Sequence, residues 1–126
     1  MTLKMLKAKI HRATVTQADL NYEGSISIDA ALMKAAGMLT CEAVNIWNVS
    51  NGERFETYII PAEENSGEIG LNGAAARRVQ TGDLLILATF CHVDAEEAAK
   101  HQPTVVFVDS RNRVVTPVPS SSSPAA

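Results

Sequence analysis

The stretch Leu84-Leu85-Ile86-Leu87-Ala88-Thr89-Phe90 is an unbroken apolar run that follows a turn at residues 80–83. A short apolar run bounded by turn residues predicts a buried β-strand. We therefore expect this strand to lie at the centre of the fold, with the other elements arranged around it.

Shorter segments on both sides of this run also favour extended structure, because they carry β-branched and alternating apolar residues. Asn51-Gly52 is a strong signal for a hairpin between two of these segments. The predicted strands cover residues 3–17, 25–28, 44–49, 54–60, 69–71 and 104–108.

A few short helices complete the prediction. Residues 30–36 are strong helix formers, Asp29 is a good N-cap, and Gly37 is a good residue to end the helix. Asn72 and Asp94 can each cap a further short helix. Many short strands with few helices favour a mainly β protein, a small closed β-barrel with short helices, over a doubly wound sheet.

Composition limits the classes of protein to consider. The 126 residues fit one domain, and 46% hydrophobic with 20% charged residues is typical of a globular protein. The net charge of -3 comes from 11 basic and 14 acidic residues without a basic cluster, which argues against a nucleic-acid partner. No segment has the length and apolarity of a signal peptide or a membrane span, so we expect no membrane partner and a cytoplasmic location.

The cysteines and the C-terminal residues complete this outline. We interpret Cys41 and Cys91 as free, partly buried thiols of a reducing compartment, because their spacing fits neither a metal site nor a disulfide framework. From Pro117 onward, Pro, Ser and Ala without periodicity predict disorder. The expected organisation is one β-barrel domain over residues 1–117 and a disordered tail over residues 118–126.

The dipeptide Gly24-Ser25 is a candidate reactive site. Glycine leaves its carbonyl carbon open to close approach, and the hydroxyl of the following serine can attack that carbonyl and convert the amide to an ester. Taken alone, however, Glu23-Gly24-Ser25 has ordinary turn composition. The rest of the sequence must therefore distinguish a reactive site from a turn.

Strand alternation predicts which faces of their strands four other polar residues occupy. Lys9 and His11 should share one face of their strand, although that alone also describes the solvated face of a sheet. Thr57 and Tyr58 should lie on opposite faces, unless a bulge or a strand end intervenes.

A helix starting at Gly73 exposes amide groups that can bind a carboxylate or an oxyanion. Alternatively, this is an ordinary capped helix whose alanines pack under a strand.

A set of short motifs runs through the chain in a fixed order. They are His11-Arg12, Thr16-Gln17-Ala18-Asp19-Leu20, Tyr22-Glu23-Gly24-Ser25, Ile46-Trp47-Asn48-Val49, Asn51-Gly52, Arg54, Thr57-Tyr58 and Asn72-Gly73-Ala74-Ala75-Ala76. In order and spacing they resemble the pyruvoyl-dependent aspartate 1-decarboxylases, over roughly residues 1–117. The resemblance implies a double-psi β-barrel, self-cleavage between Gly24 and Ser25, and a homotetramer with active sites between subunits.

The resemblance also implies roles for single residues. Ser25 becomes the covalent pyruvoyl cofactor, Thr57 assists the cleavage after Gly24, and Tyr58 is the catalytic proton donor. The implied substrate-binding positions are Lys9, Arg54, Thr57, Asn72, Gly73, Ala74 and Ala75. The implied supporting positions are His11, Tyr22 and Trp47, of which the two aromatic residues can equally be packing residues.

The reaction implied is the conversion of L-aspartate to β-alanine and CO2 through a Schiff base on the pyruvoyl group, which feeds pantothenate and coenzyme A synthesis. Decarboxylation needs an electron sink, and the sequence shows no recognisable metal, PLP or nucleotide motif that would supply one. The alternatives are a non-catalytic barrel that binds or regulates, and a pyruvoyl decarboxylase of another acidic amino acid. The sequence leaves open whether a maturation factor assists cleavage, and which substrate carboxylate Arg54 binds.

Overall fold

The computed structural model describes residues 1–115, so the predicted tail at 118–126 lies outside the described residues. Short helices connect the strands: α1 (Ala30–Ala36), the 3-10 helix η1 (Gly73–Arg78) and α2 (Ala95–Ala98). The strands are β1 (Thr2–Thr14), β2 (Gln17–Asp19), β3 (Ser25–Asp29), β4 (Ala43–Asn48), β5 (Arg54–Ala62), β6 (Ile69–Asn72), β7 (Leu84–Asp94) and β8 (Thr104–Phe107).

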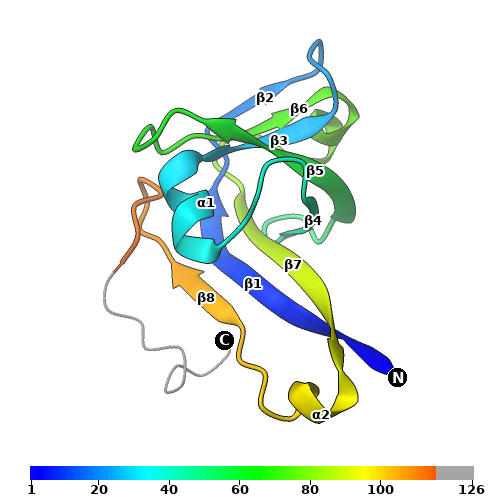
Figure 1. The fold of residues 1–126 in the computed structure, drawn as a ribbon. Helices are drawn as coiled ribbons and strands as arrows, with labels where there is room; N and C mark the ends of the chain where they lie inside the picture. Colours follow the sequence, from blue (N-terminus) through cyan, green and yellow to red (C-terminus); the bar gives the residue numbers. More distant parts are fainter. Residues whose placement is uncertain (116–126) are drawn as a thin grey trace.

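The eight strands form one sheet in the order β2-β6-β3-β5-β4-β7-β1-β8. Figure 1 shows that the sheet curls strongly, so that the half with β2, β6 and β3 lies over the half with β7, β1 and β8. The pairs β1–β8, β2–β6 and β3–β5 are parallel, and the other pairs are antiparallel. The prediction of a mainly β protein, a small barrel with short helices, is confirmed.

The apolar run at residues 84–90 forms the first part of β7, which pairs with β1 on one side and β4 on the other. Its central position is therefore confirmed. Leu85 and Leu87 are fully buried, whereas Ile86 and Phe90 are only partly buried. This difference arises because a curled sheet has one inner face, and alternate side chains point outward from it.

The helix α1 forms over the residues predicted for it. The Asp29 carboxylate accepts a hydrogen bond of 2.8 Å from the Ala31 amide, and Gly37 ends the helix in the left-handed conformation. The same carboxylate also accepts from the amides of Asn65 and Gly67, at 2.9 and 2.8 Å. Asp29 therefore links the helix to the loop between β5 and β6.

The predicted strand over residues 3–17 is divided into two strands. β1 ends at Thr14 and β2 starts at Gln17. Between them the amide of Val15 donates to the carbonyl of Asp83, and the amide of Thr16 donates to Ile69. These tertiary hydrogen bonds turn the chain from the β7 side of the sheet to the β6 side.

The structure also bears on the expectations about membrane spans, metal sites and cysteines. No helix within residues 1–115 is long and apolar enough to cross a membrane. Over the same residues, no group of three or more His, Cys, Asp or Glu side chains is placed to hold a metal ion. Both cysteines are free, but Cys41 is exposed, so its predicted partial burial is wrong, whereas Cys91 is partly buried.

Candidate active site

Ser25 is the first residue of β3 and is almost fully buried. It lies opposite Asn72 in the antiparallel pairing of β3 with β6. The Ser25 hydroxyl donates to the carbonyl of Glu23 at 3.2 Å and accepts a hydrogen bond of 2.9 Å from the Asn72 side-chain amide. The hydroxyl next to the Gly24-Ser25 peptide bond is thus held in a defined position away from water.

Asn72 does not cap the helix that follows it, so this part of the prediction is wrong. Its side chain makes no capping hydrogen bond to η1. The amide nitrogen instead donates to the hydroxyls of Ser25 and Ser27, at 2.9 and 3.0 Å. The strand pairing decides this, because it turns the Asn72 side chain toward β3 rather than along η1.

Gly73 packs directly against the backbone that precedes Ser25. A Cβ atom at this position would lie 2.6 Å from the Gly24 nitrogen, 2.7 Å from its Cα and 2.8 Å from the carbonyl oxygen of Tyr22. Gly73 also has a φ of 65°, which side chains disfavour. The absence of a side chain at residue 73 therefore allows the η1 segment to touch the candidate cleavage site.

A cavity of about 210 Å³ adjoins this contact. Its lining includes four of the sequence-predicted residues, namely Gly24, Thr57, Ala74 and Ala75. The remaining lining residues are Phe55, Glu56 and Arg78. The structure thus brings one part of the predicted site together around a space that can admit a small molecule.

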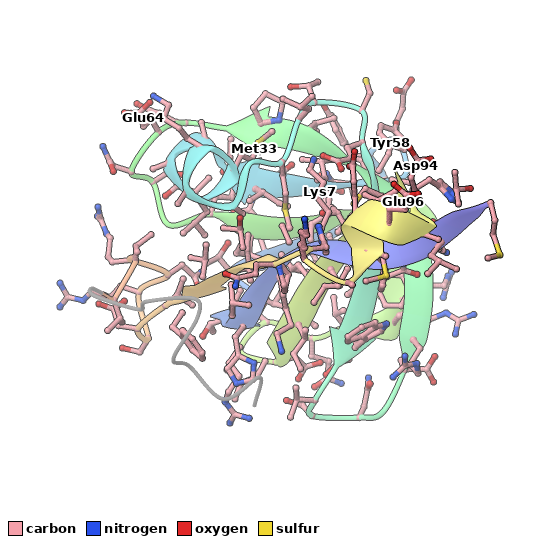
Figure 2. The ribbon with its side chains drawn as sticks, turned by 60° about the horizontal axis from the view of Figure 1, so that its bottom comes forward. Lys7, Met33, Tyr58, Glu64, Asp94 and Glu96 are labelled. Carbon is pink, nitrogen blue, oxygen red and sulfur yellow. The ribbon has the colours of Figure 1, made fainter. Side chains whose placement is uncertain are left out.

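Thr57 and Tyr58 lie on opposite faces of β5, as strand alternation predicts. The pairing of β4 with β5 runs from Trp47–Arg54 to Ala43–Tyr58 without a bulge. Thr57 is partly buried and lines the cavity with Gly24, whereas Tyr58 is exposed and does not. Figure 2 shows Tyr58 at the periphery of the molecule, in the part of the view where Asp94 and Glu96 lie.

Arg54 and Trp47 line a second, larger cavity of about 450 Å³. The Arg54 guanidinium lies over the Trp47 ring, 4.6 Å from its centroid, and this ring is tilted against Phe90. The second cavity shares only Phe55 and Glu56 with the cavity at Gly24. Within one chain, Arg54 and Trp47 are therefore neighbours of the Gly24 cavity rather than part of it.

His11 lies in a third cavity, with Arg12, Phe107 and Asp109 among its lining residues. Its ring packs edge-on against Phe107, and its buried Nδ1 atom has no hydrogen-bond partner within residues 1–115. Burial lowers the pKa of His11, and the positive charges of Lys9 and Arg12 lower it further.

The other two predicted positions have different environments. Lys9 is buried, and its charge acts on His11, in keeping with a shared face of β1. The Tyr22 side chain is exposed, and only its backbone carbonyl approaches Gly73. Neither side chain lines the cavity at Gly24.

Sequence reasoning missed three groups at this site. Ser27 binds the Asn72 amide, and the Glu23 carbonyl accepts the hydrogen bond from Ser25. Arg78 lines the Gly24 cavity, with its guanidinium paired to Glu53. The alternation of β3 was a signal for Ser27, because Ser25 and Ser27 must share a face. The position of Arg78 depends on tertiary contacts and had no such signal.

Comparisons with known proteins match nearly the whole described chain. The family model for aspartate decarboxylase matches residues 1–115. The chain is 62% identical over 110 residues to an aspartate 1-decarboxylase of Syntrophus aciditrophicus, covering 87% of this chain and 95% of that protein. It is 58% identical over 114 residues to that of Clostridium botulinum, covering 90% of each chain. A crystal structure of the computationally designed protein msDPBB_sym2 aligns with 69% of this chain and 96% of its own, at 18% identity and a TM-score of 0.42.

Proposed function

The chain belongs to the aspartate decarboxylase family, and we propose that it converts L-aspartate to β-alanine with a pyruvoyl group made from its own Ser25. The reaction removes the α-carboxylate of aspartate as CO2. The observation that carries the mechanism is the buried Ser25 hydroxyl, held by Glu23 and Asn72 beside a cavity that Gly24 lines.

Maturation converts one chain into two without loss of carbon. The Ser25 oxygen attacks the Gly24 carbonyl carbon, the peptide C–N bond breaks, and an ester forms. Loss of the Ser25 α-proton then breaks the Cβ–Oγ bond, so that the oxygen leaves as part of the Gly24 carboxylate. Water replaces the amino nitrogen, which departs as ammonia, and residue 25 ends as a pyruvoyl group. The single barrel domain is then made of a 24-residue and a 102-residue chain, 126 minus 24.

The residues around residue 25 fit such a group. When present, its carbonyl supplies the electron sink that decarboxylation requires. We assign Thr57 to the cleavage step, where its hydroxyl hydrogen-bonds the Gly24 carbonyl, because both residues line one cavity. Gly73, Ala74 and Ala75 are assigned to substrate binding through their backbone, which is supported by the place of Ala74 and Ala75 in the lining of the Gly24 cavity.

We propose that a second subunit completes the site. Tyr58, Arg54 and Trp47 carry family roles but do not line the Gly24 cavity of their own chain. Assembly of a homotetramer with sites between subunits, as the family resemblance implies, can bring these side chains to the cavity of a neighbouring chain. Tyr58 then donates the proton that completes the reaction.

Subunit mixing tests this arrangement. Ser25→Ala and Arg54→Gln chains should each be inactive or weak alone. Co-expressed with different affinity tags and purified by both tags, they should form mixed tetramers in which some sites contain a matured residue 25 and an intact Arg54. Activity no higher than that of either parent would show that Arg54 serves its own chain.

Arg54 is assigned to the side-chain carboxylate of aspartate. The α-carboxylate loses its charge on the way to the transition state, so a strong ion pair there would stabilise the ground state more and slow the reaction. The side-chain carboxylate keeps its charge throughout. A planar guanidinium on that group gives selectivity for an acidic amino acid at no cost in the chemical step.

We place the enzyme in the cytoplasm, at the step that provides β-alanine for pantothenate and coenzyme A synthesis. The two free cysteines support a reducing compartment.

Intact mass spectrometry with Ser25→Ala tests the proposed function. The wild-type protein should separate into pieces ending at Gly24 and beginning at a modified residue 25, and should release β-alanine from aspartate. The Ser25→Ala chain should stay whole and inactive, and turnover by this variant would overturn the mechanism. Purified precursor that cuts only after cell lysate is added would identify a maturation factor. Glutamate, tested in competition with aspartate, measures selectivity for the shorter acid.

A further inference from the structure

We propose that Ser27 is a positioning residue that holds the Asn72 amide in place after Ser25 has lost its hydroxyl. This inference rests on the proposed function, because only maturation removes that hydroxyl. It assigns a task to a side chain that lies beside the cleavage site without being part of the cleaved bond.

The geometry connects three buried side chains. Ser25, Ser27 and Asn72 are 1%, 8% and 5% exposed. Ser25 and Ser27 point to the same face of β3, and the Asn72 side chain reaches both from the facing strand β6. Its nitrogen is 2.9 Å from the Ser25 oxygen and 3.0 Å from the Ser27 oxygen.

An asparagine amide nitrogen carries two hydrogens, and here each has a hydroxyl acceptor. The two hydrogen bonds together fix the rotation of the amide plane. Because the group is buried, a hydrogen that loses its acceptor cannot turn to bulk water, and an unpaired buried donor is unfavourable.

Maturation removes one of the two acceptors. The Ser25 oxygen leaves with the Gly24 carboxylate, so the N–H that pointed at it is released. The hydrogen bond to Ser27 survives, since no atom of Ser27 takes part in the reaction. With the amide plane still held by Ser27, the released N–H keeps its direction toward residue 25, where it can donate to the newly formed carbonyl or to bound substrate.

The inference predicts that loss of the Ser27 hydroxyl affects the two stages differently. In the precursor, the Ser25 hydroxyl still orients Asn72, so Ser27→Ala should cut within about twofold of the wild-type rate. In the matured enzyme the Ser25 hydroxyl no longer orients Asn72, so kcat should fall about three- to ten-fold, the range expected for one lost neutral hydrogen bond. KM should change less than kcat.

Matched variants separate positioning from general damage. Ser27→Thr keeps the hydroxyl and should restore kcat. Ser66→Ala removes a serine hydroxyl that accepts from a loop amide, that of Glu68, and should leave both stages unchanged. Cutting is followed by intact mass, and turnover is measured only on fully cut protein.

A readout independent of turnover is the rate at which borohydride reduces the carbonyl of residue 25, followed by intact mass. A donor held near this carbonyl polarises it, so reduction should be slower in cut Ser27→Ala than in the wild type and should recover in Ser27→Thr. Wild-type kcat and reduction rate in cut Ser27→Ala would overturn the inference while leaving the proposed function intact. Equal slowing of cutting and turnover would also overturn it, because Ser27 would then act before Ser25 is lost. A failure of the proposed function itself would show separately, as β-alanine release by Ser25→Ala.

Discussion

Substitution of Gly73 by alanine should separate folding of this protein from its self-cleavage. The added Cβ would lie 2.6 Å from the Gly24 nitrogen, and the next two contacts, at 2.7 and 2.8 Å, are also backbone atoms. Backbone cannot swing aside as a long side chain can. To reach an ordinary contact of 3.4 Å, the two segments must separate by about 0.8 Å, the difference between 3.4 and 2.6 Å.

That displacement falls on the residue whose carbonyl carbon is attacked. A misplacement of about 1 Å in a reacting group typically lowers a rate by about 100-fold. We therefore expect Gly73→Ala to slow cleavage by roughly 100-fold. The left-handed backbone at this residue adds a loss of stability of about 1–2 kcal/mol for any residue with a side chain.

Gly37→Ala is the matched control for the second effect. Gly37 has a φ of 73°, close to the 65° of Gly73, but no atom of residues 1–115 lies within 4 Å of its added Cβ. This variant should lose about 1–2 kcal/mol of stability and cut at the wild-type rate. The measurements are the cleavage half-time by intact mass and the free energy of unfolding of each uncut chain in a Ser25→Ala background. Wild-type cleavage in Gly73→Ala would refute the reasoning, as would equal slowing in Gly37→Ala.

Three further predictions concern the remaining site residues. Thr57→Val should cut roughly 10-fold more slowly, whereas Tyr58→Phe should cut normally and lose at least about 100-fold in kcat; near-normal turnover by the cut Tyr58→Phe protein would contradict these roles. Arg54→Gln should weaken inhibition by β-alanine about as much as it weakens aspartate binding, and unchanged product inhibition would place Arg54 on the α-carboxylate. Since the pKa of His11 is lowered in the folded protein, the unfolded chain binds more protons below about pH 6.5, so stability should fall as pH drops through that window. His11→Gln should flatten this part of the curve in urea unfolding, and an unchanged slope would argue against the lowered pKa.

Much of the fold could be predicted from local sequence. Asp29 and Gly37 mark the start and the end of α1. A side-chain acceptor is favoured at the start of any helix and a left-handed residue at its end, so both positions can be identified without knowing the tertiary structure. The apolar run at residues 84–90 was predictable as a central strand because an apolar segment is stable only when other elements cover it. The opposite faces of Thr57 and Tyr58 follow from the two-residue period of a strand, and no bulge interrupts it.

The composition of the candidate site was predictable only in part. The motif resemblance named both a family and its site residues, and the family comparison confirms the family. Neither indicates which of these residues meet within one chain. Gly24, Thr57, Ala74 and Ala75 share a cavity, but Arg54 and Tyr58 do not line it.

The partners of Asn72 and Gly73 were decided by tertiary structure alone. Locally, Asn72 is a good helix cap, because its side-chain oxygen can accept from an amide of the first helical turn. The pairing of β6 with β3 turns it instead toward Ser25 and Ser27. Contacts between residues more than 40 positions apart depend on which strands pair across the sheet. The alternation within one strand indicates which of its side chains share a face, but not which residue of a distant strand lies opposite them.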